Sequence, residues 1–202
     1  KHPLMERFGV DAIPFAHPLL KEWQENFKGV QYHHKEMNLI ITGAIDDLWQ
    51  AARGELFVVD YKSTSTRGPI DLNSEYKEAY KRQMEIYQWL LRKQELKVSG
   101  TGYFVYCNAD KDQEMFNGQL VFGLEIIAYQ GDDAWVEGAI RDAKKCLMSE
   151  FTPEYSDNCE YCQYNKAIGE ASGDHLAPMK KISREQSSLT EVTLPNKQKE
   201  FL

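Results

Sequence analysis

Residues 55–62 alternate in the way expected of one strand of a β-sheet. Because successive side chains of a strand point to opposite faces, Val58, Asp60 and Lys62 share one face. An apolar strand has no packing reason to place a carboxylate and an ammonium two residues apart on the same face. The pattern therefore predicts either a charged functional site or an Asp–Lys ion pair on a solvated sheet face, and alone it does not distinguish them.

A second carboxylate precedes this strand. Residues 39–50 predict an apolar strand with Asp46 near its middle, interrupted at Gly43, where a bend or bulge is expected. A hairpin between the two strands would bring Asp46 toward Asp60. Two carboxylates about 4 Å apart repel by roughly 4 kcal/mol at an effective dielectric of about 20, so a packed sheet holds both ionised only with compensation. A divalent cation such as Mg²⁺ or Mn²⁺, together with the Lys62 ammonium, would supply it and activate a water.

The remaining periodicities predict helices and strands in a mixed order. Helices are expected at residues 17–27, at 74–97 with Ser74 as the N-cap, and from 132 or 133 to about 150. Strands are expected at residues 31–37, 39–50, 55–62, 101–107 and 119–129. Strands joined by hairpins, combined with a strand–helix–strand step, predict an α/β fold in which helices flank a mixed central β-sheet.

The length of 202 residues suits one domain with a sizeable core. We expect this domain over residues 1–168, followed by a polar tail or loosely docked extension at 169–202. The chain begins at Lys1 rather than at Met, which leaves room for a missing N-terminal segment. No apolar run approaches the ~20 residues of a membrane helix, and no signal-peptide pattern is present, so a cytoplasmic location without a membrane partner is expected.

The net charge of −7 lacks the basic footprint that is typical of nucleic-acid-binding proteins. Carboxylates that bind a metal, however, count as negative charge until the metal is present. Basic residues also cluster locally, at Lys77, Lys81, Arg82, Arg92, Lys93 and Lys97. This cluster indicates either a nucleic-acid contact or the solvated face of one helix.

Three spaced motifs resemble those of a known nuclease family. The motifs are Gly43-x-x-Asp46, Asp60-x-Lys62 and Gln83-x-x-x-Tyr87. They are similar to the motifs of the PD-(D/E)XK nuclease superfamily, and within it they most resemble the RecB-like nucleases, which include CRISPR-associated exonucleases with an iron–sulfur cluster. The resemblance spans residues 31–162 and implies a restriction-endonuclease-like core.

The resemblance implies a role for each motif residue. Asp46 and Asp60 would bind the catalytic metal, and the backbone carbonyl of Tyr61 would be a further ligand. Lys62 would be the catalytic lysine, placed to orient the attacking water or to stabilise the transition state.

Gln83 and Tyr87 would lie one helical turn apart and face the site and the DNA backbone, whereas the plain alternative is helix surface and core. The expected function is an Mg²⁺- or Mn²⁺-dependent deoxyribonuclease of the exonuclease type, acting on single-stranded DNA or duplex ends in repair, recombination or defence. Two alternatives stay open. One is a catalytically inactive nucleic-acid-binding or assembly module that retains the nuclease fold, and the other is a structural metal-bound interaction domain.

Many RecB-like nucleases add a histidine from an N-terminal helix. His17 is the candidate with a helix behind it, although Pro18 follows it directly. His33 and His34 are expected on a polar strand. Glu36 could approach the metal, but a solvated glutamate is the simpler interpretation.

The pair Cys159-x-x-Cys162 lies where iron–sulfur nucleases of this kind carry cluster ligands, and its spacing lets two thiolates bind one iron or zinc. Four ligands are needed, and no cysteine follows the pair. Cys107 and Cys146 lack suitable spacing and are expected to be buried and inert. The pair would therefore be half of a site completed by a missing segment, or a remnant of one.

Overall fold

The structure is a computed structural model that describes residues 2–115, 118–151 and 153–172. The chain divides between Lys144 and Lys145 into two compact units. The first unit contains the predicted motif residues, and the second contains the helix α5 (Glu160–Ser172). Most of the predicted tail at 169–202 lies outside the described residues, so the domain boundary at residue 168 stays a prediction.

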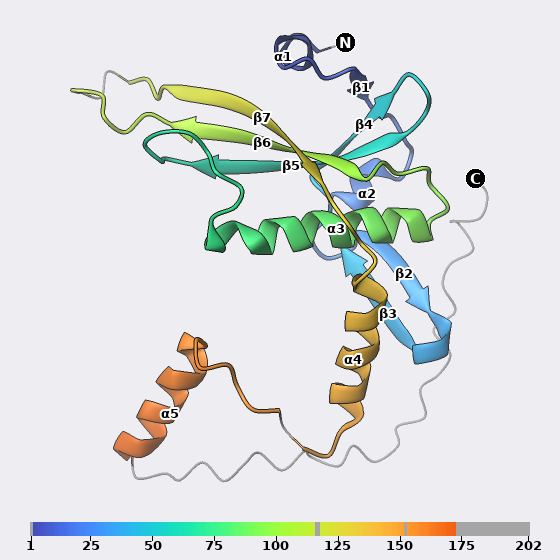
Figure 1. The fold of residues 1–202 in the computed structure, drawn as a ribbon, viewed down its shortest axis with the longest axis vertical. Coiled ribbons are helices and arrows are strands. Elements are labelled where there is room, and N and C mark those ends of the chain that lie inside the picture. Colours follow the sequence, from blue (N-terminus) through green and yellow to red (C-terminus); the bar gives the residue numbers. More distant parts are fainter. Residues whose placement is uncertain (1, 116–117, 152, 173–202) are drawn as a thin grey trace. The chain divides into compact units, whose positions relative to one another are not determined.

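A five-stranded mixed sheet forms the centre of the first unit. Its strands are β1 (Ala12–Pro14), β4 (Asp47–Ala51), β5 (Leu56–Thr64), β6 (Thr101–Ala109) and β7 (Phe122–Gln130). They lie in the order β1-β4-β5-β6-β7, with only β5 and β6 parallel. The helix α3 (Glu78–Lys93) connects β5 to β6 and crosses one face of the sheet (Figure 1). The predicted α/β fold with a mixed central sheet flanked by helices is confirmed.

Two clusters of buried side chains cover the two faces of this sheet. The α3 face includes Val58, Met84, Leu90 and Phe104, each 0 % exposed. The opposite face includes Val59 and Val105 and is covered by Met5 from the short helix α1 (Pro3–Arg7). Because side chains alternate along β5, Asp60 and Lys62 follow Val58 onto the α3 face, where helix side chains can reach them.

The predicted strand at 39–50 is wrong in one respect, because it is two strands in different sheets. Residues Leu39–Gly43 form β3, which pairs with β2 (Val30–His34) in a separate two-stranded sheet. Between the strands, the N–H of Ile45 donates to the carbonyl of Trp23 at 3.1 Å. This long-range contact draws the chain away from strand geometry, so Asp46 lies just before β4 and not within a strand.

The two earlier predicted helices are shorter than expected. In place of a helix at 17–27, α2 covers only Leu20–Trp23. Ser74 is not the N-cap of α3, because a 3₁₀ turn, η2 (Glu75–Lys77), precedes that helix. The hydroxyl of Ser74 instead donates to the carbonyl of Asp71 at 3.2 Å, so a hydrogen bond within the turn holds Ser74 outside the helix.

The C-terminal part of the first unit is attached to α3 by a buried carboxylate. Glu85 is 8 % exposed and accepts hydrogen bonds of 2.6 Å from the Tyr129 hydroxyl and the Trp135 indole N–H. Tyr129 lies on β7, and Trp135 lies just before α4 (Val136–Met148). These bonds fix the orientation of α3 relative to the sheet edge, which in turn positions the helix face that contacts β5.

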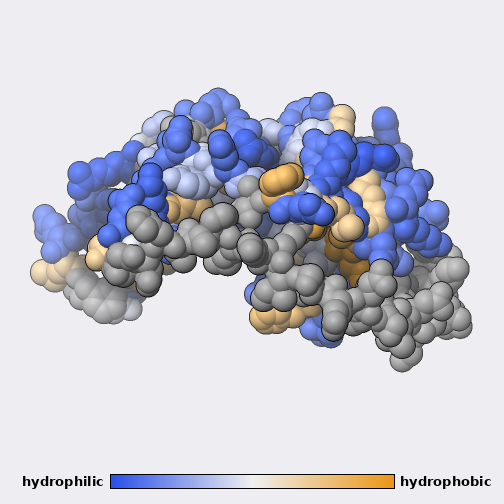
Figure 2. Space-filling view, turned by 90° about the horizontal axis from the view of Figure 1, so that it is seen from below, coloured by the Kyte–Doolittle hydropathy of each residue, from blue (hydrophilic) through white to orange (hydrophobic). Residues whose placement is uncertain are grey.

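Among the described residues, no helix is long and apolar enough to cross a membrane. Among the residues coloured in Figure 2, hydrophilic ones predominate, and hydrophobic residues lie among them in small groups. The short 3₁₀ turn η1 (Lys35–Met37) links β2 to β3 and carries exposed charged residues.

Candidate active site

The strand β5 presents a carboxylate and an ammonium in contact with each other. Asp60 is 2 % exposed, and its Oδ2 forms an ion pair with Nζ of Lys62. Apart from this contact, Oδ2 of Asp60 has no well-formed hydrogen bond within the described part of the chain. The predicted solvated ion pair is wrong, because a charge pair at the covered face of a sheet loses most of its hydration.

Asp46 lies beside Asp60 and is held by the backbone of β5. Its Oδ2 accepts a hydrogen bond of 2.8 Å from the N–H of Tyr61. The carbonyl of Asp46 accepts another, of 2.7 Å, from the side-chain amide of Gln24, just beyond α2. These two bonds fix the orientation of a carboxylate that belongs to neither strand.

The electrostatics of Asp60 show how close the two carboxylates lie. Burial raises the pKa of Asp60 above its ordinary value, the Lys62 ammonium opposes this rise, and the negative charge of Asp46 adds to it. A site with this arrangement favours the binding of a cation. A cation would offset both the free-energy cost of burying an ionised carboxylate and the repulsion between the two carboxylates.

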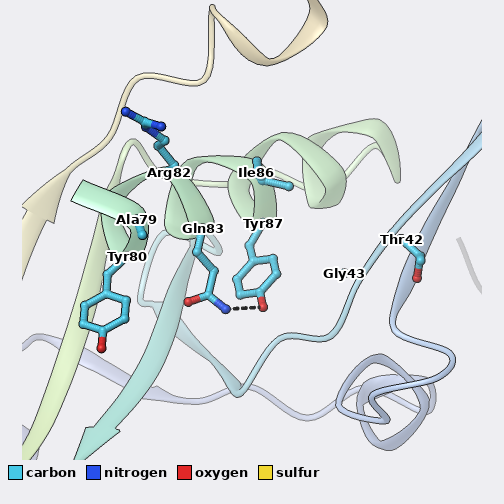
Figure 3. A pocket seen from close by; sticks show the side chains of 8 residues that line it. All are labelled: Thr42, Gly43, Ala79, Tyr80, Arg82, Gln83, Ile86 and Tyr87. Carbon is cyan, nitrogen blue, oxygen red and sulfur yellow. Dashed lines mark hydrogen bonds between the residues drawn. The ribbon is translucent and has the colours of Figure 1, made fainter. Parts of the chain in front are cut away.

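The site continues onto α3 through a chain of side-chain contacts. Lys62 Nζ donates to Oε1 of Gln83 at 3.2 Å, and Nε2 of Gln83 donates to the Tyr87 hydroxyl at 2.8 Å. Lys62 Nζ also lies 4.6 Å from the centre of the Tyr80 ring. Gln83 and Tyr87 point from α3 toward the same side, as Figure 3 shows. The structure therefore brings Asp46, Asp60, Lys62, Gln83 and Tyr87 together.

A groove runs along the helix beside these residues. It has a volume of about 570 Å³ and is lined by Thr42 and Gly43 of β3 and by α3 side chains, including Arg82, Gln83 and Tyr87 (Figure 3). Gly43 has a packing role here, since a Cβ at this position would lie 2.9 Å from Cε1 of Tyr87. The absence of a side chain therefore lets the Tyr87 ring lie against β3.

The donor set of this site fits a hard divalent cation. The described residues contain no group of three or more His, Cys, Asp or Glu side chains placed to hold a metal. Asp46 and Asp60 supply carboxylate oxygens, however, and the Lys62 ammonium opposes the repulsion between them. Two carboxylates completed by waters and a substrate phosphate are a usual way to bind Mg²⁺, so the residues present are suitable.

Within the described part of the chain, the other metal candidates form no metal-binding group with the two aspartates. The ring of His17 is stacked between Phe15 and Trp23, with centroid distances of 5.7 and 4.7 Å, and its Nδ1 accepts from the N–H of Leu19. His34 is on a strand, as predicted, but it is buried and contacts Glu137 at 2.7 Å.

His33 and Glu36 are exposed, in agreement with the solvated interpretation. Glu36 contacts Arg141 at 3.9 Å. Neither residue forms a metal-binding group with the two aspartates.

In the second unit, Cys159 and Cys162 lie together at the start of α5, with their sulfur atoms 3.2 Å apart. A hydrogen bond from the Cys162 thiol lowers the pKa of Cys159, with help from nearby backbone N–H groups. Within the described residues no third ligand joins them, so a cluster or zinc at this pair stays a prediction. Cys146 was expected to be buried and is exposed, because helical periodicity does not say which face packs.

Sequence reasoning missed Gln24, Tyr80 and Tyr106 as neighbours of the site. Tyr80 precedes Gln83 by three residues, so helical spacing could have placed it on the same face. Tyr106 stands opposite Lys62 in the parallel pairing of β5 and β6. No sequence signal gives that register, which depends on how the two strands align.

Comparison with known proteins agrees with the geometry. The family model of the PD-(D/E)XK nuclease superfamily matches residues 10–167, which is most of the chain. Comparison with curated proteins and with solved structures gives no match. Nucleases of this superfamily generally use divalent metal ions, which agrees with the paired carboxylates. On the extent of the family match, the chain belongs to the PD-(D/E)XK nuclease superfamily.

Proposed function

We propose that this protein is an Mg²⁺- or Mn²⁺-dependent deoxyribonuclease of the exonuclease type, with Asp46, Asp60 and Lys62 at its catalytic centre. The family relationship supports a nuclease-type function. The observation that carries the proposal is the convergence of Asp46, held by the Tyr61 N–H, on the buried Asp60–Lys62 pair. A packed sheet gains nothing from two adjacent carboxylates unless a cation joins them.

In this proposal, Asp46 and Asp60 hold the divalent cation, and the backbone carbonyl of Tyr61 contributes a further oxygen. When bound, such a cation lowers the pKa of a coordinated water and neutralises charge on phosphoryl oxygens. The ammonium of Lys62 already contacts Asp60, so it would lie beside the attacking water or the scissile phosphate and stabilise the charge that develops there.

The DNA strand would approach along the groove beside α3. The hydrogen-bonded side chains of Gln83 and Tyr87 form one wall of the groove next to Lys62, and they would orient the sugar–phosphate backbone. Arg82 also lines the groove, but its guanidinium points to the other side of α3 from Gln83 and Tyr87 (Figure 3). The Gln83-x-x-x-Tyr87 helix also supports assignment to the RecB-like branch.

The test is a cleavage assay on single- and double-stranded DNA carrying a label at either end, with Mg²⁺ or Mn²⁺. Asp60→Asn and Lys62→Met should each lower the cleavage rate about 10²–10³-fold, as expected for the loss of one group that stabilises transition-state charge. Asp112→Asn is the matched control, because Asp112 forms an exposed ion pair with Arg67. Release of mononucleotides from one labelled end supports the exonuclease type.

Equal activity of wild type and both site variants would overturn the proposal. DNA binding without turnover under every divalent cation would instead favour an inactive binding module. Cleavage of RNA in place of DNA would support the nuclease function but would show that the substrate is RNA.

A further inference from the structure

Tyr106 places a buried hydroxyl group beside the site. Its side chain is 2 % exposed, and its oxygen has no hydrogen bond with any described residue. Tyr106 is paired with Lys62 across β5 and β6, so both side chains lie on the α3 face of the sheet. Burying a hydroxyl without a partner costs free energy, so this group would gain a hydrogen bond from a ligand oxygen that reaches it.

A second lysine lies over the ring of Tyr106. Nζ of Lys77 is 4.8 Å from the ring centre, next to the similar contact between Lys62 and Tyr80. Among the described side chains, no carboxylate contacts Lys77, whereas Lys81 contacts Glu78 and Lys93 contacts Glu137, each at 3.5 Å. The charge of Lys77 is therefore available to an anion.

The hydroxyl of Tyr106 acts as a donor. Burial raises its pKa to about 12, with smaller contributions from Tyr80 and from the negative charge of Asp60. A protonated hydroxyl and an ammonium are both donors, and together they recognise an oxyanion in preference to a cation. The influence of Asp60 on Tyr106 also shows that the Tyr106 hydroxyl lies within electrostatic range of the proposed catalytic centre.

Resting on the nuclease function above, we propose that Lys77 and Tyr106 form a second phosphate-binding subsite, which takes a DNA backbone phosphate next to the scissile one. Lys62 is paired with Asp60, and Lys77 would add a separate positive charge for the strand beyond the reacting phosphate. A single DNA strand carries one such phosphate per nucleotide, and side chains of these types make most protein–phosphate contacts.

The test measures binding of a fluorescently labelled single-stranded oligodeoxynucleotide by anisotropy, with EDTA to prevent cleavage and over a range of NaCl concentrations. Loss of one phosphate contact in Lys77→Gln should reduce the slope of log K against log salt by about 0.7, and Lys77→Arg should restore it. Tyr106→Phe should raise Kd about tenfold, because a hydrogen bond to a charged oxygen is lost.

Stability separates binding from a structural role. Tyr106→Phe removes a hydroxyl that bonds to none of the described residues, so its urea midpoint should equal or exceed that of wild type. Lys93→Gln is the control for Lys77, because Lys93 lies 5.0 Å from the Trp89 ring but is paired with Glu137. Tyr103→Phe is the control for Tyr106, since it alters the opposite face of the same strand.

The outcomes distinguish this inference from the proposed function. If wild type cleaves DNA while Lys77→Gln and Tyr106→Phe bind it unchanged, the subsite is refuted and the nuclease function stands. If no cleavage occurs but binding depends on Lys77 and Tyr106, the subsite stands and the catalytic proposal fails. Absence of DNA binding by wild type at every salt concentration overturns both, and lower stability of Tyr106→Phe with unchanged Kd overturns the subsite.

Discussion

The carboxylate of Asp46 accepts a 2.8 Å hydrogen bond from the backbone N–H of Tyr61, the residue between Asp60 and Lys62. One side chain from outside the sheet is thereby fixed to the centre of the Asp-x-Lys motif. The bond uses one carboxylate oxygen for positioning, while the charge of the group faces Asp60. Positioning and charge can therefore be separated by mutation.

Asp46→Asn keeps an oxygen that can accept from Tyr61 but removes the charge. We expect an unfolding free energy close to that of wild type and a cleavage rate lower by about 10²-fold or more. Asp46→Ala also removes the acceptor and should lose about 1 kcal/mol of stability. Urea unfolding and the cleavage assay on both variants test this, and equal stability of the two would contradict the role of the hydrogen bond.

Divalent cations should stabilise the folded protein by binding between Asp46 and Asp60. At a free concentration ten times Kd, Mg²⁺ or Mn²⁺ would raise the unfolding free energy by about 1.4 kcal/mol, and EDTA should reverse the effect. The increase should vanish in Asp60→Asn and persist in the exposed control Asp112→Asn. Thermal unfolding with and without metal measures it, and an equal shift in all three proteins would place the cation elsewhere.

Gly43→Ala should displace the Tyr87 ring. The added Cβ would lie 2.9 Å from Cε1 of Tyr87 and 3.0 Å from Cδ1 of Leu90, which is closer than side chains tolerate. We expect a loss of about 1–3 kcal/mol from overpacking, together with weaker oligonucleotide binding, because the Gln83–Tyr87 hydrogen bond would be disturbed.

The matched control is Gly138→Ala in α4, where a Cβ meets no atom within 4 Å. Alanine is the better helix former, so this variant should gain up to about 1 kcal/mol. Chemical denaturation of both variants gives the comparison. Similar effects at the two glycines would show that Gly43 has no special packing role.

The contact between His34 and Glu137 should make stability depend on acid pH. The hydrogen bond from His34 lowers the pKa of Glu137 below its ordinary value of 4.5, with help from Lys93. The folded state then binds fewer protons than the unfolded state in this range. The stabilisation is therefore fully present above pH 4.5 and is lost as the pH falls through the folded pKa.

The measurement is the difference in unfolding free energy between wild type and Glu137→Gln at pH 7 and at pH 3.5. The difference should be larger at pH 7. Glu36→Gln is the control, since the Glu36 side chain is 80 % exposed and lies 3.9 Å from Arg141, and it should have little effect at either pH. A Glu137→Gln difference independent of pH would contradict the role of the ionised carboxylate.

The parts of the fold that were predicted correctly have strong local periodicity. Alternation along residues 55–62 identified β5 and the shared face of Asp60 and Lys62. Helical spacing placed Gln83 and Tyr87 on one face of α3, where they are hydrogen-bonded. Both patterns depend on residues two to four positions apart, which the backbone geometry itself brings together.

The errors occurred where distant segments decide the local conformation. The strand predicted at 39–50 is divided because Trp23 and Gln24 bond to residues 45 and 46. The ring of His17 is stacked on the rings of Phe15 and Trp23, a packing that no local pattern indicates. Exposure of Cys146 likewise depends on which helix face packs.

By itself, the sequence determined the chemical groups of the site, because Asp60, Lys62, Gln83 and Tyr87 share faces through backbone periodicity alone. Only the tertiary structure decided that Asp46 reaches them from a connecting segment, through hydrogen bonds to residues 22 and 15 positions away. The parallel alignment of β5 with β6 likewise placed Tyr106 beside Lys62. The physical reason is that contacts between distant segments depend on strand register and helix packing, which no short sequence window contains.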